Sequence, residues 1–195
     1  MVTKIKYGNT NTFFIKGSKA NILIDTDYAG TLFAFYKALK EAGLKVSDIK
    51  YFLATHYHPD HIGLVSELMD QGVKLLILES QLPYVHYSDP IFAKEPYLNY
   101  KAIDESKAEI LRFSEASAFL SSIGIDGDIL PATSHSEDSI IVTLGNGTVI
   151  AGDLEPFEYL EAYEDNKALK ADWDKVLKSN PKRVLYAHAN EKRFD

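Results

Sequence analysis

Residues His56-Tyr57-His58-Pro59-Asp60-His61 place four side chains that can bind a metal in one short segment. Half of the six histidines of the chain lie there. The apolar residues 49–55 before the segment predict a buried strand, and the apolar spacing of residues 62–69 after it predicts a helix. A strand-to-helix turn lets these side chains converge. A solvated loop is the alternative, but chance gives such a string only about once in several thousand sequences. The segment therefore predicts a metal site.

Composition restricts the type of metal site and the compartment. The chain contains no cysteine, so thiolate ligands and disulfides are excluded. Imidazole and carboxylate donors favour zinc, iron or manganese. The N-terminus has no apolar core of signal-peptide length, and no segment approaches the roughly 20 apolar residues of a membrane span. We therefore expect a cytoplasmic protein without membrane contact.

Length and charge indicate one domain that acts on a small molecule. A chain of 195 residues suits a single domain, which we assign to residues 1–195. The net charge of −7 argues against nucleic acid as a partner, because nucleic-acid binders usually carry a basic stripe. A small-molecule substrate is the expectation that remains. The sequence carries no signal for an oligomeric state.

Hydrophobic periodicity predicts an α/β layered domain. Strands are expected at residues 2–7, 11–16, 20–25, 49–55, 74–78, 127–132, 139–144, 148–151 and 183–187. Helices are expected at residues 31–41, 62–69, 114–123 and 166–179. The pair Asn146-Gly147 is a strong hairpin-turn signal between two of these strands.

Residues of about 79–113 interrupt this regular pattern. They contain three prolines and four tyrosines, and we expect an irregular insertion of loops and short helices. His86 and Tyr87 lie in its least regular part and are predicted to contact the substrate. The alternative is that most aromatic residues of the insertion pack it onto the domain.

Three further polar residues lie at the ends of predicted strands or in the turns that connect them. His135 lies in a polar turn between two strands, Asp153 follows an apolar strand and Gly152, and His188 follows the last strand. Each residue alone has an ordinary explanation as a surface or core side chain. Together with the first segment, they place five of the six histidines at strand ends or in turns between strands.

This ordered set resembles the metallo-β-lactamase fold hydrolases. Their pattern is H-x-H-x-D-H, then a histidine in a turn, a Gly-Asp pair at a strand end and a last histidine near the C-terminus. The resemblance covers nearly the whole chain, and residues 21–26 match the aspartate-bearing strand that precedes the motif. Two positions depart from it: Ser134 replaces a usual glycine, and alanines flank His188. The resemblance implies a four-layer αββα sandwich of two mixed β-sheets flanked by helices.

The resemblance also implies a site for two divalent metal ions, with zinc as the first choice and iron or manganese as alternatives. The first ion would be held by His56, His58 and His135, the second by Asp60, His61 and His188, and Asp153 would bridge them. Asp60 would also carry a proton as a catalytic residue. Asp25 and Asp138 are candidates for the acceptors that fix the imidazole tautomers. Asp25 has an equal alternative as a strand-end turn residue.

Hydrolysis is the reaction that the resemblance implies. Two ions about 3.5–4 Å apart share a hydroxide that attacks an electrophilic centre and together stabilise the leaving group. The acidic balance of the chain disfavours RNA or DNA, and a small ester, lactone or thioester remains as the expected substrate. Three alternatives stay open. They are a phosphodiesterase, a di-iron redox centre of flavodiiron type, and a metal-binding domain without catalysis. Flavodiiron proteins carry a carboxylate where His58 stands.

Overall fold

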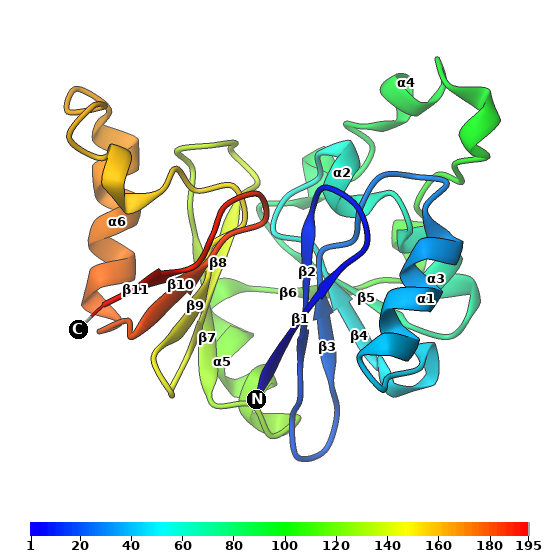
Figure 1. The fold of residues 1–195 in the computed structure, drawn as a ribbon, viewed down its shortest axis with the longest axis horizontal. Helices are drawn as coiled ribbons and strands as arrows, with labels where there is room; N and C mark the ends of the chain where they lie inside the picture. Colours follow the sequence, from blue (N-terminus) through cyan, green and yellow to red (C-terminus); the bar gives the residue numbers. More distant parts are fainter. Residues whose placement is uncertain (195) are drawn as a thin grey trace.

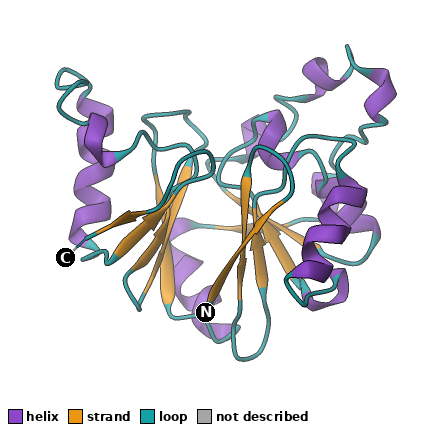
Figure 2. Ribbon diagram, in the orientation of Figure 1, coloured by secondary structure: helices purple, strands orange, loops and turns teal. Residues whose placement is uncertain are grey.

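In the computed structural model, which describes residues 1–194, two mixed β-sheets face each other (Figure 1, Figure 2). The first sheet has the strand order β1-β2-β3-β4-β5-β6, and the second has the order β11-β10-β9-β8-β7. In the first, β1, β2 and β3 pair antiparallel and β3 to β6 pair parallel. In the second, only β9 and β10 pair parallel. The strands are β1 Val2–Lys6, β2 Asn11–Ile15, β3 Ile22–Ile24, β4 Tyr51–Leu53, β5 Lys74–Leu78, β6 Glu109–Leu111, β7 Gly127–Pro131, β8 Ile140–Leu144, β9 Thr148–Ile150, β10 Arg183–Leu185 and β11 Lys192–Arg193.

Helices cover the outer faces of both sheets. Helices α1 and α3 lie on the first sheet and α6 lies on the second, while α5 sits below the junction of the two (Figure 1). The α-helices are α1 Leu32–Glu41, α2 Pro59–Ile62, α3 Val65–Asp70, α4 Asp89–Phe92, α5 Phe113–Ser122 and α6 Lys167–Lys178. Short 3₁₀ helices are η1 Val46–Asp48, η2 Leu82–Tyr84, η3 Pro96–Leu98, η4 Glu105–Lys107 and η5 Phe157–Tyr159. Within residues 1–194, no helix combines the length and apolar composition that a bilayer crossing requires.

Alternating side chains along the strands build the layers. In β3, Ile22 and Ile24 face the core between the sheets, whereas Leu23 faces the core beneath α1 and α3. In β8, Ile141 packs in a third core against α6, together with the fully buried Trp173. A strand that is apolar on both faces requires cover on both faces, so the sequence produces a helix-sheet-sheet-helix arrangement. The predicted fold class is confirmed.

The predicted helix at residues 62–69 is instead divided into α2 and α3. The break lies at Leu64, whose φ of −110° and ψ of 7° depart from helical values. It follows Gly63, which packs so closely that an added Cβ would lie 2.2 Å from the backbone nitrogen of Ala29. Helix α2 also begins earlier than expected, at Pro59, so Asp60 and His61 lie on a helical turn and not before it.

The insertion predicted at about 79–113 ends earlier than expected. Its first part contains η2, α4, η3 and η4 and extends from the body of the molecule (Figure 1). Residues Glu109–Leu111, however, form β6, which pairs with β5 and completes the first sheet. This strand has only three residues, begins with a glutamate and buries only Leu111, so its sequence contains no apolar run that would predict a strand. Strand β11, with two residues, was also not predicted.

Candidate metal centre

The seven side chains predicted as metal ligands lie together at one end of the two sheets. His56 and His58 follow β4, Asp60 and His61 lie on α2, His135 lies between β7 and β8, Asp153 follows β9, and His188 follows β10. Their donor atoms form three overlapping groups, in each of which the atoms lie within 4.8 Å of one another: His56, His58 and His135; His56, His61 and Asp153; and Asp60, His61 and His188. Segments from both sheets are therefore needed to assemble the cluster.

Asp153 lies between two sets of imidazoles. Its Oδ2 is 3.8 Å from Nε2 of His56 and 3.7 Å from Nε2 of His135. Its Oδ1 is 3.4 Å from Nε2 of His61 and 3.5 Å from Nε2 of His188. Each carboxylate oxygen therefore faces a different set, as a carboxylate shared by two cations would.

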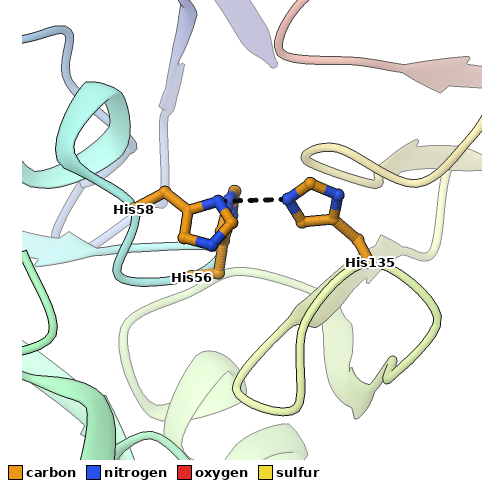
Figure 3. Close-up of side chains that lie close together, drawn as sticks. All are labelled: His56, His58 and His135. Atoms are coloured by element: carbon orange, nitrogen blue, oxygen red, sulfur yellow. Dashed lines mark hydrogen bonds between the residues drawn. The ribbon is translucent and has the colours of Figure 1, made fainter.

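Three histidines make the first set. In Figure 3 the rings of His56, His58 and His135 converge, with His135 entering from the second sheet. Nε2 of His135 is 3.2 Å from Nδ1 of His58. His56 is buried, His58 is half-buried and His135 is exposed, so this set opens toward solvent on one side.

Asp60, His61 and His188 make the second set. Nε2 of His188 lies 3.1 Å from Oδ2 of Asp60 and 3.3 Å from Nε2 of His61. His61 is fully buried, whereas Asp60 and His188 are partly exposed. Like the first set, the second set combines one buried donor, on His61, with donors that solvent can reach, on Asp60 and His188.

Two buried polar atoms in the cluster lack hydrogen-bond partners within residues 1–194. They are Nε2 of His56 and Oδ1 of Asp153. An unpaired buried polar group costs about 1–3 kcal/mol, and a coordinated cation would satisfy both atoms. The donor set of imidazoles and carboxylates fits zinc, iron or manganese. The residues present therefore suit divalent metal ions.

The model of one protein family, the metallo-beta-lactamase superfamily, matches residues 5–188, a range that includes the whole cluster. The chain belongs to the metallo-beta-lactamase superfamily. A beta-lactamase-like protein 2 homolog of Drosophila melanogaster is 23% identical over 184 residues, which are 93% of this chain and 59% of the relative. A Thermosynechococcus vestitus protein named as a diflavin flavoprotein is 27% identical over 106 residues, 53% of this chain and 18% of that protein. The chain thus spans less than two thirds of either relative.

Solved structures of the superfamily share the fold. A metallo-beta-lactamase family protein from Thermus thermophilus aligns with a TM-score of 0.74 and 20% identity, over 99% of this chain and 74% of that one. An archaeal superfamily protein from Sulfolobus tokodaii aligns with a TM-score of 0.67 and 17% identity, over 98% of this chain and 81% of that one. At these identities the comparison establishes the architecture alone.

Asp25 orients two of the clustered imidazoles in this superfamily member. Its Oδ2 is 3.0 Å from Nδ1 of His61, and the same oxygen accepts the hydroxyl proton of Thr55 at 2.8 Å. Because the Thr55 hydroxyl donates its proton to Asp25, its oxygen can only accept from Nδ1–H of His56, at 3.2 Å. Both histidines therefore turn Nε2 toward Asp153. Asp25 has the positive φ of 58° and is held in place by the backbone N–H of Thr55 at 2.6 Å.

Asp138, predicted to orient an imidazole, has a different hydrogen-bond partner. Its Oδ2 accepts from the backbone N–H of Tyr57 at 2.7 Å. This contact fixes the backbone between His56 and His58, so Asp138 supports the turn and does not set a tautomer. The expectation was wrong in its partner, because the N–H of the buried Tyr57 is a backbone donor that needs an acceptor, and Asp138 supplies it.

His86 and Tyr87, predicted to contact the substrate, have different surroundings. Both ring nitrogens of His86 are held by carboxylates, with Nδ1 2.8 Å from Asp89 and Nε2 3.0 Å from Glu105. His86 thus stabilises the insertion and is not part of the metal cluster. Tyr87 is 58% exposed, and its ring centroid is 5.8 Å from that of His58. Only Tyr87 of the two is beside the cluster.

Charge divides the two sets of donors. Burial, followed by the neighbouring histidines, holds the pKa of His56 well below its usual range, and burial also lowers the pKa of His135. Burial opposes charge on His61 as well, but Asp25 and Asp153 outweigh it and raise its pKa to about 10. For Asp60, burial is outweighed by the hydrogen bond with His188, so its pKa falls to about 2. His56 and His135 are therefore neutral at pH 7, whereas His61 holds a proton.

Metal binding to the second set is expected to strengthen as pH rises. Since the pKa of His61 is about 10, a cation must displace a proton from it at neutral pH. Each displaced proton makes the apparent affinity rise about tenfold per pH unit below that pKa. The lowered pKa values of His56 and His135 predict that these two ligands release no proton to a metal above about pH 6.5, so the affinity of the first set should rise less steeply with pH. Chelator competition at several pH values measures both affinities, and equal pH slopes would contradict the prediction.

Asn11, which sequence reasoning missed, joins the two sheets beside His188. Its Nδ2 donates to the carbonyl oxygens of Tyr186 at 2.9 Å and Ala189 at 3.4 Å. Its backbone N–H donates to the carbonyl of Ala187 at 2.7 Å. These contacts hold the backbone on both sides of His188. An asparagine at the start of a predicted strand was the only available sequence signal.

Asn11→Ala is expected to weaken Zn²⁺ binding at the second set by about 10-fold or more while leaving binding at the first set unchanged. The reason is that only His188 loses backbone support, and His188 belongs to the second set alone. Calorimetric titration with Zn²⁺ would resolve the two affinities. Asn9→Ala is the matched control, because Asn9 is exposed and lies two residues away. Equal weakening of both ions would contradict the assignment.

Proposed function

We propose that the chain is a dinuclear metal-dependent hydrolase that cleaves an ester, lactone or thioester bond of a small molecule. The observation that carries the proposal is the position of Asp153, whose two oxygens face two separate sets of imidazoles. Each set would hold one divalent ion, and the donor chemistry favours zinc, with iron or manganese as alternatives. The ligands would be His56, His58 and His135 for one ion and Asp60, His61 and His188 for the other, with Asp153 between them.

When bound, the two ions supply a nucleophilic hydroxide near neutral pH and positive charge that stabilises the leaving group. The residues of the chain orient and protect this chemistry. Asp25 and Thr55 keep Nε2 of His56 and His61 directed inward. Asp60 is partly exposed, and we infer that it would take up a proton and pass it to the leaving group. Its pKa of about 2 keeps it ionised at neutral pH, so it would hold that proton only briefly.

A small substrate is supported by the size of the opening at the cluster. A pocket of about 210 Å³ is lined by His135, Asp153 and His188. The net charge of −7 does not favour a nucleic acid. Esters, lactones and thioesters all present one carbonyl carbon, which a pocket of this size admits.

A chromogenic substrate panel on metal-reconstituted protein tests the proposal. The panel contains an activated carboxylic ester, a lactone, a thioester and bis(4-nitrophenyl) phosphate. We expect turnover of at least one carbonyl substrate, its loss on chelation and its absence in His58→Ala. Turnover of the phosphate diester alone would assign the chain to the phosphodiesterases. No metal-dependent turnover of any substrate would overturn the hydrolase proposal and favour a metal-binding domain without catalysis.

A di-iron redox centre is the second candidate, supported by the similarity to the Thermosynechococcus vestitus protein. The imidazole of His58 within the cluster counts against it, because flavodiiron proteins resemble this chain but carry a carboxylate there. Iron-reconstituted protein that consumes oxygen or nitric oxide with a reductant, without hydrolysing the panel, would favour the redox function.

A further inference from the structure

A second, larger pocket opens beside His188. It has a volume of about 620 Å³, and Lys4, Lys6, Lys192, Asn11 and Asn190 are among its lining residues. It shares Pro156, His188 and Ala189 with the smaller pocket that reaches Asp153. A molecule placed at the metal cluster can therefore extend into this larger pocket.

The acidic residues of the larger pocket are already neutralised. Glu158 is paired with Lys192 at 2.7 Å, and Glu191 is paired with Arg193 at 2.6 Å. Neither Lys4 nor Lys6 has a carboxylate partner within residues 1–194, where Lys6 donates only to the carbonyl of Asn9 at 3.1 Å and to the amide oxygen of Asn11 at 3.4 Å. Two positive charges therefore remain uncompensated in the pocket wall, although the protein as a whole is acidic.

The strand geometry of β1 places these two charges together. Side chains two residues apart lie on the same face of a strand, so Lys4 and Lys6 share one face while Ile5 points into the core. Pairing of Lys6 with Asn11 and of Lys4 with Phe13 in the antiparallel ladder keeps this edge in fixed register. Asn11 also anchors the backbone around His188, so the charged face and the metal cluster share one rigid connection.

We propose that Lys4 and Lys6 bind an anionic group of the substrate, a carboxylate or a phosphate, at a distance from the bond that is cleaved. The inference rests on the proposed hydrolase function and adds a substrate class to it. The anionic group lies in the larger pocket, and the reactive carbonyl lies in the smaller pocket at the cluster. Because the two lysines are exposed, their effect is on substrate binding and weakens with added salt.

Two esters with the same reactive bond test the proposal on the metal-reconstituted full chain. The 4-nitrophenyl monoester of adipic acid carries a remote carboxylate, and 4-nitrophenyl hexanoate is its neutral counterpart. We expect the preference in kcat/KM for the adipate ester to fall about threefold to fivefold for each of Lys4→Met and Lys6→Met, mainly through KM. Lys40→Met, on α1, is the control and leaves the preference unchanged. An unchanged preference in the double variant would overturn the proposal.

A binding measurement separates this inference from the proposed function. Free adipate and inorganic phosphate are titrated separately into wild type and the Lys4→Met/Lys6→Met variant, and binding is followed by calorimetry. Weaker binding of adipate in the variant assigns the site to carboxylates, and weaker binding of phosphate assigns it to phosphates. Either result supports the anionic site even if neither ester is hydrolysed, an outcome that would count against the hydrolase function alone. Equal binding of both anions by wild type and variant would overturn the anionic site, whatever the turnover.

Discussion

Asp153→Asn is expected to reduce kcat/KM on a carbonyl substrate by more than about 100-fold and to prevent tight binding of two metal ions at once. Substitution of residues that only support a ligand already costs about 10–100-fold, so loss of the shared carboxylate costs more. Asparagine has the same shape, but it lacks the negative charge that screens two neighbouring cations. The two oxygens of Asp153 lie between His56 and His135 on one side and His61 and His188 on the other.

The comparison requires metal content, metal affinity and activity on the same preparations. Circular dichroism should show an intact fold in Asp153→Asn, because the side chain makes no backbone hydrogen bond among the described contacts of residues 1–194. Asp70→Asn is the matched control, since Asp70 is an exposed carboxylate that pairs with Lys101 at 2.6 Å and lies outside the cluster. Two tightly bound ions in Asp153→Asn would show that this carboxylate is not shared.

The residues of the cluster were predictable from the sequence because each one follows a predicted strand or lies in a turn between strands. Strand ends in packed sheets meet at a common edge, so the H-x-H-x-D-H segment, Asp153 and His188 were expected to lie close together. Their roles as metal ligands stay a prediction. The resemblance implied that Asp153 lies between the two sets, whereas the residue pattern alone gave no basis for it, because this position depends on how the two sheets approach each other.

The supporting contacts were harder to predict, since they join residues far apart in the chain. Asn11 and Tyr186 are 175 positions apart, and their hydrogen bond exists only because the start of β2 in one sheet meets the segment that follows β10 in the other. In the sequence, Thr55 is an ordinary residue at a strand end, and only the structure shows that its hydroxyl donates a hydrogen bond to Asp25. His86 pairs with two carboxylates of the insertion, Asp89 and Glu105. A single sequence contains no signal that predicts these pairs.

Gly152→Ala is expected to lower the free energy of unfolding by about 2–5 kcal/mol. Gly152 has a φ of 55°, a left-handed conformation that costs an alanine about 1–2 kcal/mol. A Cβ there would also lie 2.6 Å from Oγ1 and 2.8 Å from Cβ of Thr55, which is tighter than packing permits. Displacement of such a contact adds about 1–3 kcal/mol. Urea unfolding with a chelator present measures the effect without any contribution from bound metal.

Gly43→Ala isolates the conformational part of this cost. Gly43 has a similar φ of 71°, but a Cβ there would meet nothing within 4 Å. We expect it to lose only about 1–2 kcal/mol and to bind metal like wild type. Gly152→Ala should also bind metal more weakly, because Thr55 precedes His56 and Gly152 precedes Asp153, so separating them moves ligands from both sheets. Equal stability losses in the two variants would mean that the contact between the sheets at Thr55 adapts freely and does not fix the metal centre.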